Sequence, residues 1–185
     1  AGRALSALEV SGHWVDLATD WIRGHPLDWA ALLGRKVLLA WNWREIEDTD
    51  DFYLYAEWSP FLGALGTVGC FGVLAPLAAL GAVLTRRRWR ELFLPHAFLV
   101  TVTASIALFF VFGRYRFSMV PLLALLAGAG VVEGWAALRA RRFVWPGGAG
   151  AAAALVAVLV HLPMHDRPIP SATGYNNLAD AWAGM

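Results

Sequence analysis

Residues 61–85 have the sequence FLGALGTVGCFGVLAPLAALGAVLT, which contains no charged side chain. A helix of about 20 mostly apolar residues is long enough to cross the hydrocarbon core of a bilayer, which is about 30 Å thick. This stretch therefore predicts a transmembrane helix over residues 61–85.

Three further apolar runs follow. Residues 92–113 are uncharged apart from the titratable His96, residues 117–138 carry the single carboxylate of Glu133, and residues 147–163 form a shorter run rich in alanine and valine. The whole chain is 58% hydrophobic and 16% charged, against about 45–50% and about 25% in soluble domains. We therefore predict an all-α fold, a polytopic membrane helix bundle with about four transmembrane helices.

Basic side chains collect in two of the predicted connections. Arg86, Arg87, Arg88 and Arg90 lie between the first two spans, and Arg139, Arg141 and Arg142 lie between the last two. Short basic loops stay on the cytoplasmic side of a membrane. Residues 1–60, the connection between the second and third spans, and the tail over residues 164–185 are then predicted to be external. The net charge of +1 gives no indication of a nucleic-acid partner.

Residues 1–60 predict an external or interfacial helical region. Trp14, Leu17, Trp21 and Ile22 recur at helical spacing. The dipeptide His25-Pro26 marks a break, and a second apolar stripe begins at Trp29. Such amphipathic helices suit a membrane surface, and they equally suit packing onto the rest of a subdomain.

Two groups of residues have types that metals prefer. Glu45, Glu47, Asp48, Asp50 and Asp51 form an acidic run. Carboxylates bind hard cations, but the spacing matches no known loop, and a solvated turn with capping carboxylates is the better interpretation. His161 and His165 are four residues apart with Pro163 between them, which disfavours a zinc pair on one helix. We predict no metal site.

The connection between the second and third spans is little more than Gly113-Arg114-Tyr115-Arg116. Because it is short, both guanidinium groups are expected at the external membrane surface. One explanation is a bound anion at headgroup depth, such as the phosphate of a lipid-linked substrate, because the planar guanidinium fork binds phosphate oxygens in a bidentate way. The other is snorkelling to membrane lipid headgroups or pairing with acidic residues of the first sixty.

Several stretches together resemble one enzyme family. They are Trp21-Ile22-Arg23-Gly24-His25-Pro26, the run from Gly34 to Asn42, Arg44-Glu45-Ile46 with Ser59-Pro60, and Phe112-Gly113-Arg114-Tyr115-Arg116-Phe117 followed by Pro121. The chain resembles, over about residues 10–140, the C-terminal half of bacterial GT-C glycosyltransferases of the dolichyl-phosphate-mannose–protein mannosyltransferase-like group, glycosyltransferase family 39.

The resemblance implies a function and a location. Such enzymes move a sugar from a polyprenyl-phosphate donor to an acceptor hydroxyl at the outer face of the bacterial cytoplasmic membrane. It also implies that Arg114 and Arg116, with Tyr115, bind the lipid phosphate and stabilise it as it leaves. The family's catalytic base, an aspartate in the first external loop, has no counterpart here. We therefore expect no catalytic residue in this chain. We interpret the chain as a fragment and expect it to be inactive by itself.

The tail carries a second, shorter resemblance. Ala172 to Met185 is similar to the first helix of a tetratricopeptide repeat, with Tyr175, Asn177, Leu178, Ala179 and Trp182 at matching places. An alternative function is therefore a non-catalytic membrane anchor that presents such repeats to a protein partner. A transporter segment is a third alternative, but transporter spans usually carry polar groups near the midplane, and these spans carry few.

Overall fold

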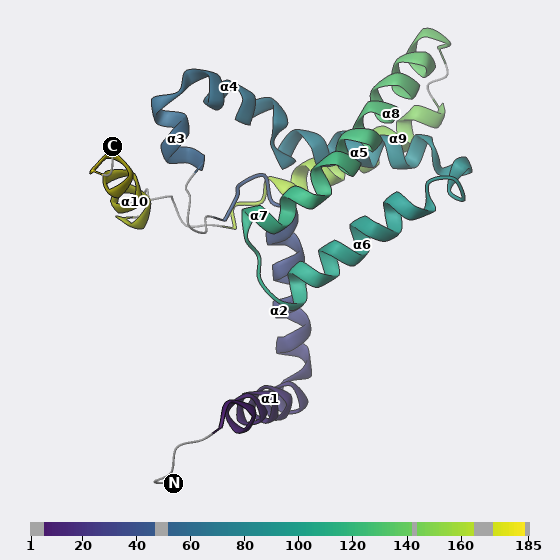
Figure 1. Cartoon of the computed structure of the whole chain (residues 1–185). Coiled ribbons are helices and arrows are strands. Elements are labelled where there is room, and N and C mark those ends of the chain that lie inside the picture. The colour runs from purple at the N-terminus through teal and green to yellow at the C-terminus, as the bar shows by residue number, and fades with distance from the viewer. Residues whose placement is uncertain (1–5, 47–51, 142–143, 165–171, 184–185) are drawn as a thin grey trace. The chain divides into compact units, whose positions relative to one another are not determined.

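The computed structural model describes residues 6–46, 52–141, 144–164 and 172–183. Its elements, in chain order, are α1 (Ala7–Gly24), α2 (Pro26–Trp41), α3 (Phe52–Trp58), α4 (Pro60–Gly69), α5 (Phe71–Leu84), the 3-10 turn η1 (Arg86–Arg88), α6 (Phe93–Leu108), α7 (Gly113–Arg116), the 3-10 turn η2 (Phe117–Met119), α8 (Val120–Arg139), α9 (Val144–Val160) and α10 (Ala172–Ala183), labelled in Figure 1. The described residues contain no strand, so the predicted all-α fold is confirmed.

The chain divides into two compact units, Ala1–Arg35 and Lys36–Met185. In the first unit, Ser6 caps α1 by accepting a hydrogen bond from the Glu9 amide at 3.3 Å, while the Glu9 carboxylate accepts one from the Ser6 amide at 2.9 Å. This reciprocal pair satisfies two amides that the helix leaves unpaired. The helix ends at Gly24 and α2 begins at Pro26, so the predicted break at His25-Pro26 is confirmed.

The apolar stripe of α1 is solvent-exposed within its own unit. Trp14 is 62% exposed, Leu17 54% and Trp21 45%. The imidazole of His25 stacks on the Trp21 ring with their centroids 5.3 Å apart. The amphipathic helix expected in this region is thus present, with an apolar face that the first unit leaves uncovered.

In the second unit, α5 packs along both α8 and α9 (Figure 1). Two glycines permit the approach of α5 to α8. A Cβ on Gly130 would lie 2.6 Å from the Leu77 carbonyl oxygen and 2.8 Å from the Gly81 amide, too close for any side chain. Small residues allow helix backbones to approach in this way. Gly130 on α8 and Gly81 on α5 therefore lie at the point where the two helices touch.

Two helical stretches of the described residues are long and apolar enough to cross a membrane. Pro60–Leu84 has 25 residues and a mean hydropathy of 2.0, and Gly113–Arg139 has 27 residues and a mean hydropathy of 1.7. The first is interrupted at Cys70, whose extended backbone separates α4 from α5. These stretches correspond to the spans predicted over residues 61–85 and 117–138.

The helix predicted over residues 92–113 is shorter than expected. α6 has 16 residues and ends at Leu108. The Phe109 carbonyl accepts a hydrogen bond from Lys36 Nζ at 3.1 Å, and the Gly113 amide donates to the Ile46 carbonyl at 3.0 Å. Because these main-chain groups find partners outside the helix, the chain leaves helical geometry before Gly113. The fourth predicted span corresponds to α9, a helix of 17 residues.

The core of the second unit lies where α2, α5, α6 and α8 meet. Its buried members are Ala40, Phe71, Ala78, Leu99, Ile106, Met119, Leu123 and Leu126. These side chains pack the end of α2 against α5, α6 and α8. The segment after Trp41 therefore begins at a position that the core holds in place.

Candidate functional site

The Gly113–Arg116 turn begins the longest helical stretch of the described chain. The residue before it, Phe112, is extended, and Gly113 donates its amide to the carbonyl of Ile46 at 3.0 Å. A Cβ on Gly113 would lie 3.3 Å from a carboxylate oxygen of Glu45. The absence of a side chain at Gly113 therefore lets the turn lie directly against the segment around Glu45.

Arg116 is completely buried and holds that segment in place. Its Nη1 donates to the Arg44 carbonyl at 2.9 Å, and its Nη2 donates to the Asn42 carbonyl. The guanidinium carbon lies 4.0 Å from the centroid of the Phe71 ring, a cation–π contact. Arg116 Nε is buried and has no hydrogen-bond partner among the described residues. This placement differs from the expectation that both guanidinium groups lie at the external surface.

Arg114 and Tyr115 are exposed, in contrast to Arg116. The Arg114 guanidinium carbon lies 5.1 Å from the centroid of the Tyr115 ring, and its Nη2 is 3.3 Å from the phenol oxygen. Stacking on the ring holds a planar guanidinium in one orientation. The turn therefore presents an oriented cation to the outside, while the arginine two residues later fixes the backbone.

The segment held by Arg116 is also tied to the end of α9. Asn42 is 1% exposed; its amide nitrogen donates to the Leu162 carbonyl at 2.9 Å, and its amide oxygen accepts from the Arg44 amide at 3.1 Å. The Trp43 amide donates to the Val160 carbonyl at 2.9 Å. The side-chain nitrogen and oxygen of Asn42 thus each have a partner, and together they join the segment after α2 to the chain just beyond α9.

A cavity of about 590 Å³ lies beside this turn, which we call the polar cavity. Side chains of α3, α4 and the start of α5 form part of its wall, together with Trp43, Glu45, Tyr53, Cys70 and His161. The Trp43 and His161 rings are stacked, 6.1 Å apart and inclined by 16°. An aromatic face next to a carboxylate, a phenol and an imidazole suits a ligand with both hydroxyl groups and an apolar side.

Tyr53 connects the polar cavity to the turn. Its phenol oxygen accepts a hydrogen bond from the Glu45 amide at 3.0 Å, and the Arg44 guanidinium lies 5.1 Å from its ring centroid. Burial raises the pKa of the Tyr53 phenol above its ordinary value. The phenol therefore stays protonated at neutral pH and lies beside Glu45 as a neutral hydroxyl.

The sequence singled out the Gly113–Arg116 turn but did not pair it with Asn42 and Arg44. Arg116 contacts main-chain carbonyls, which every residue carries, so no side-chain pattern reveals the pairing. The one available signal was the Trp41-Asn42-Trp43-Arg44-Glu45-Ile46 run in the resemblance. In the structure this run and the Gly113–Arg116 turn are in direct contact.

The two groups considered as metal ligands are only partly visible. Of the acidic run, Glu45 lines the polar cavity, while Glu47, Asp48, Asp50 and Asp51 lie outside the described residues. His165 likewise lies outside them. Across the described ranges, no three histidine, cysteine, aspartate or glutamate side chains gather closely enough to hold a metal ion.

Comparison of the chain with protein-family models, with curated proteins and with solved structures gave no match.

Proposed function

We propose that this chain is the C-terminal membrane part of a glycosyltransferase that moves a sugar from a polyprenyl-phosphate donor to an acceptor hydroxyl at the outer face of a bacterial cytoplasmic membrane. One observation carries the proposal. The two sequence runs behind the family resemblance, around Asn42 and around Arg114, lie about 70 residues apart in sequence and are joined by the hydrogen bonds of Arg116. Together they form one site next to the polar cavity.

In this proposal Arg114 and Tyr115 contact the phosphate of the donor. Arg114 is exposed, keeps its charge at any physiological pH and is oriented by the Tyr115 ring. Arg116 positions the turn through its bonds to Asn42 and Arg44. It adds a buried positive charge behind the site, which favours an anion in front of it.

The polar cavity receives the sugar. Glu45 lines this cavity and lies next to Gly113, so one residue borders both the phosphate contact and the cavity. The acceptor oxygen attacks the anomeric carbon, and the bond from that carbon to the phosphate oxygen breaks. The phosphate leaves with the electron pair, and Arg114 stabilises its charge. The hydroxyl proton goes to a base outside this chain, as the family resemblance implies.

The membrane arrangement belongs to the same proposal. The stretches Pro60–Leu84 and Gly113–Arg139, with α6 and α9 as shorter apolar helices, cross the bilayer. The arginine-rich α5–α6 and α8–α9 connections lie on the cytoplasmic side, as basic loops do. The Gly113–Arg116 turn and the first sixty residues are then external, where a donor phosphate at headgroup depth meets Arg114.

Turnover of a polyprenyl-phosphate sugar by the full-length protein in nanodiscs tests the proposal. Arg114→Ala is expected to lower kcat by about 10²–10³-fold, the usual effect of removing one donor to a developing charge, with the thermal unfolding temperature unchanged. Arg139→Ala, a second exposed arginine beside an aromatic ring, is the matched control. If the wild type turns over the donor and Arg114→Ala does so equally well, the donor phosphate does not bind at this turn. If the wild type turns over no polyprenyl-phosphate sugar, the proposal that the protein is a glycosyltransferase is wrong.

A non-catalytic anchor that presents tetratricopeptide repeats is the second candidate. α10 is a helix where the first repeat helix is expected, and Tyr175 and Trp182 on it are 45% and 64% exposed. If wild-type protein turns over no donor, this candidate predicts that peptide binding depends on Tyr175 and Trp182. Tyr175→Ala and Trp182→Ala would then abolish capture of the partner while leaving the membrane helices folded.

A further inference from the structure

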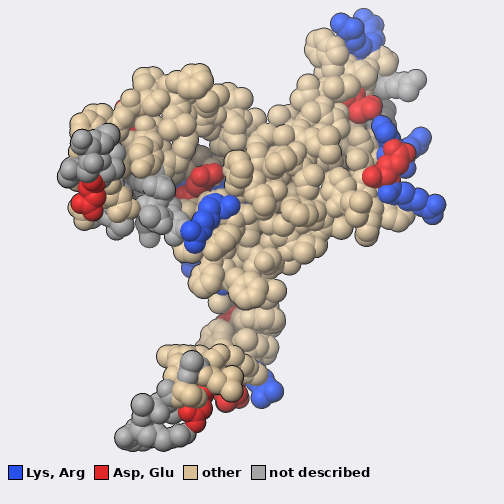
Figure 2. All heavy atoms as spheres, in the orientation of Figure 1, with Lys and Arg blue, Asp and Glu red and all other residues tan. Residues whose placement is uncertain are grey.

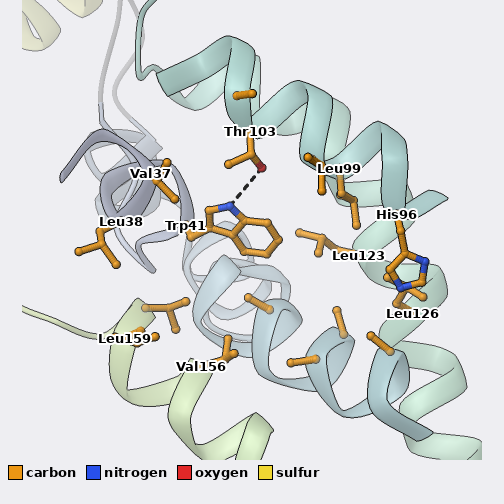
Figure 3. A pocket seen from close by; sticks show the side chains of 17 residues that line it. Val37, Leu38, Trp41, His96, Leu99, Thr103, Leu123, Leu126, Val156 and Leu159 are labelled. Carbon is orange, nitrogen blue, oxygen red and sulfur yellow. Dashed lines mark hydrogen bonds between the residues drawn. The ribbon is translucent and has the colours of Figure 1, made fainter. Parts of the chain in front are cut away.

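A second cavity, of about 620 Å³, lies among α2, α5, α6, α8 and α9 and is here called the apolar cavity. Figure 3 shows the Trp41 indole projecting into its middle, with Leu99 and Leu123 beside it and Val156 and Leu159 opposite. Its lining is almost entirely hydrocarbon. The Trp41 N–H is not available to a ligand because it donates to the Thr103 hydroxyl at 3.2 Å.

This apolar space is open at its rim, so apolar molecules from the surroundings can enter it. Interiors are packed to the density of organic crystals, and an apolar cavity of only about 150 Å³ already takes up benzene. Water is a poor occupant because it needs two to four polar partners. The occupant is therefore a hydrocarbon, and in a chain with helices long enough to cross a bilayer a lipid chain is the available one.

The apolar cavity continues toward a basic connection. A smaller cavity of about 200 Å³ is lined by Thr85, Arg86 and Trp89, and it shares Ala82 and His96 with the apolar cavity. In Figure 3, His96 lies at one side of the view and Val37 and Leu38 at the other, with Trp41 between them. The two cavities thus border each other at Ala82 and His96, between the hydrocarbon-lined interior and the start of α6.

The mouth of the smaller cavity is positively charged. Between residues 86 and 91 the chain carries four arginines and one glutamate, and Figure 2 shows these charges gathered on one end of the tan surface. Glu91 is paired with Arg88 at 2.9 Å. Arg90 lies 5.8 Å from the centroid of the Trp89 ring, and Trp89 is itself 58% exposed. A tryptophan with arginines beside it is typical of the depth of lipid headgroups.

We propose that the apolar cavity and the basic connection are one binding site for an anionic phospholipid. The phosphate contacts Arg86 and Arg90 at the mouth, beside Trp89. One acyl chain passes Ala82 and His96 and fills the apolar cavity as far as Trp41. Basic pockets between membrane helices bind anionic headgroups in this way. The site lies at the opposite end of α6 from the Gly113–Arg116 turn, so it is separate from the proposed donor site. It rests on the proposed membrane arrangement but not on the transferase activity.

Native mass spectrometry of the full-length protein tests this, with phosphatidylglycerol and phosphatidylcholine of the same acyl chains offered in equal amounts. Wild-type protein is expected to retain phosphatidylglycerol over phosphatidylcholine. Each arginine at the mouth accounts for about a fivefold preference, the usual strength of a basic side chain near an anionic surface. The Arg86→Gln/Arg90→Gln double variant should therefore lose about thirtyfold of preference, whereas Arg139→Gln, on the α8 end, should lose little. If the double variant fails to fold, the single variant Arg90→Gln tests the same headgroup contact.

A cavity-filling variant tests the acyl chain. Ala82→Phe places a ring where the two cavities join and is expected to lower retention of both lipids. Ala124→Phe, an exposed alanine of α8 outside the cavity lining, should leave retention unchanged. Equal retention of the two lipids by wild type, or a preference that survives the double variant, would overturn the headgroup contact. Full retention by a folded Ala82→Phe variant would overturn the chain path.

Discussion

The Arg116 guanidinium donates to the main-chain carbonyl of Asn42, a residue 74 positions earlier in the sequence. The same guanidinium also reaches the Arg44 carbonyl, so a single buried side chain fixes the turn that follows α2 against the start of the longest helix. The polar cavity and the exposed Arg114 both depend on this junction for their position.

Replacing Arg116 is expected to destabilise the protein. Arg116→Ala leaves the buried Asn42 carbonyl and the part-buried Arg44 carbonyl without donors, and an unsatisfied buried group costs about 1–3 kcal/mol. Arg116→Lys rescues only part of this, because an ammonium group cannot span both carbonyls as the planar fork does. Thermal unfolding in detergent should show a lower Tm for both variants, with Arg139→Ala, at an exposed arginine, near wild type. Equal Tm values for Arg116→Ala and Arg139→Ala would show that the junction contributes nothing.

A larger side chain at Gly130 is expected to separate α5 from α8. Any Cβ at Gly130 meets the Leu77 carbonyl at 2.6 Å, whereas one at Gly128, on the same helix, meets nothing within 4 Å. Gly130→Leu should therefore cost at least the 1–3 kcal/mol typical of overpacking, and Gly128→Leu should cost little. Size-exclusion chromatography after heating distinguishes the two. If both variants remain folded to the same temperature, the close contact of α5 with α8 at Gly130 is contradicted.

The helices were readable from the sequence because apolar runs and the His25-Pro26 break are local signals. The end of α6 was not, since Leu108 is followed by Phe109, Phe110 and Val111, which are as apolar as the helix itself. The helix stops there because Lys36 and Ile46 take up the main-chain groups of Phe109 and Gly113. Such partners come from tertiary structure, and the hydropathy of the sequence does not reveal them.

The candidate site was predictable in part for a similar reason. Two arginines in a four-residue connection predict guanidinium groups at the surface of the protein, and Arg114 is exposed. Its function at a membrane surface stays a prediction. Burial of Arg116 follows from the approach of Asn42 and Phe71, which the linear spacing of charges does not contain. The polar cavity forms because α3 and α4 lie near His161. The hydropathy of the sequence does not predict that arrangement.

The proposed membrane arrangement predicts which positions can be labelled from outside. Cys70 is the single cysteine of the chain, so a Cys70→Ala background allows one cysteine to be introduced at a time. Ser118→Cys, next to the Gly113–Arg116 turn, should react with a membrane-impermeant maleimide in intact cells. Glu91→Cys, at the start of α6, should react only after permeabilisation. Labelling of both from the same side would contradict the arrangement.

The Tyr53 phenol predicts an alkaline effect. Burial raises the pKa of Tyr53, so the folded value lies above the unfolded value of about 10. Its contribution to stability is then complete below the unfolded pKa and is lost as the pH rises through the folded pKa. Wild type should lose stability relative to Tyr53→Phe in that alkaline window, measured as the difference in Tm. A difference that does not change with pH would show that the phenol is not protected by burial.

Asn42 tests the connection between the turn and α9. Asn42→Leu keeps a side chain of similar size but leaves the Leu162 carbonyl and the Arg44 amide without their partner. Both bonds are part-buried, so each lost bond costs toward the lower end of the about 1–3 kcal/mol of a buried group, and the midpoint of chemical unfolding in mild detergent should fall. Asn176→Leu, the same change at an exposed position of α10, should leave the midpoint in place. If both variants unfold at the same denaturant concentration, the side chain of Asn42 does not hold α9, and the order of the polar cavity must come from Arg116.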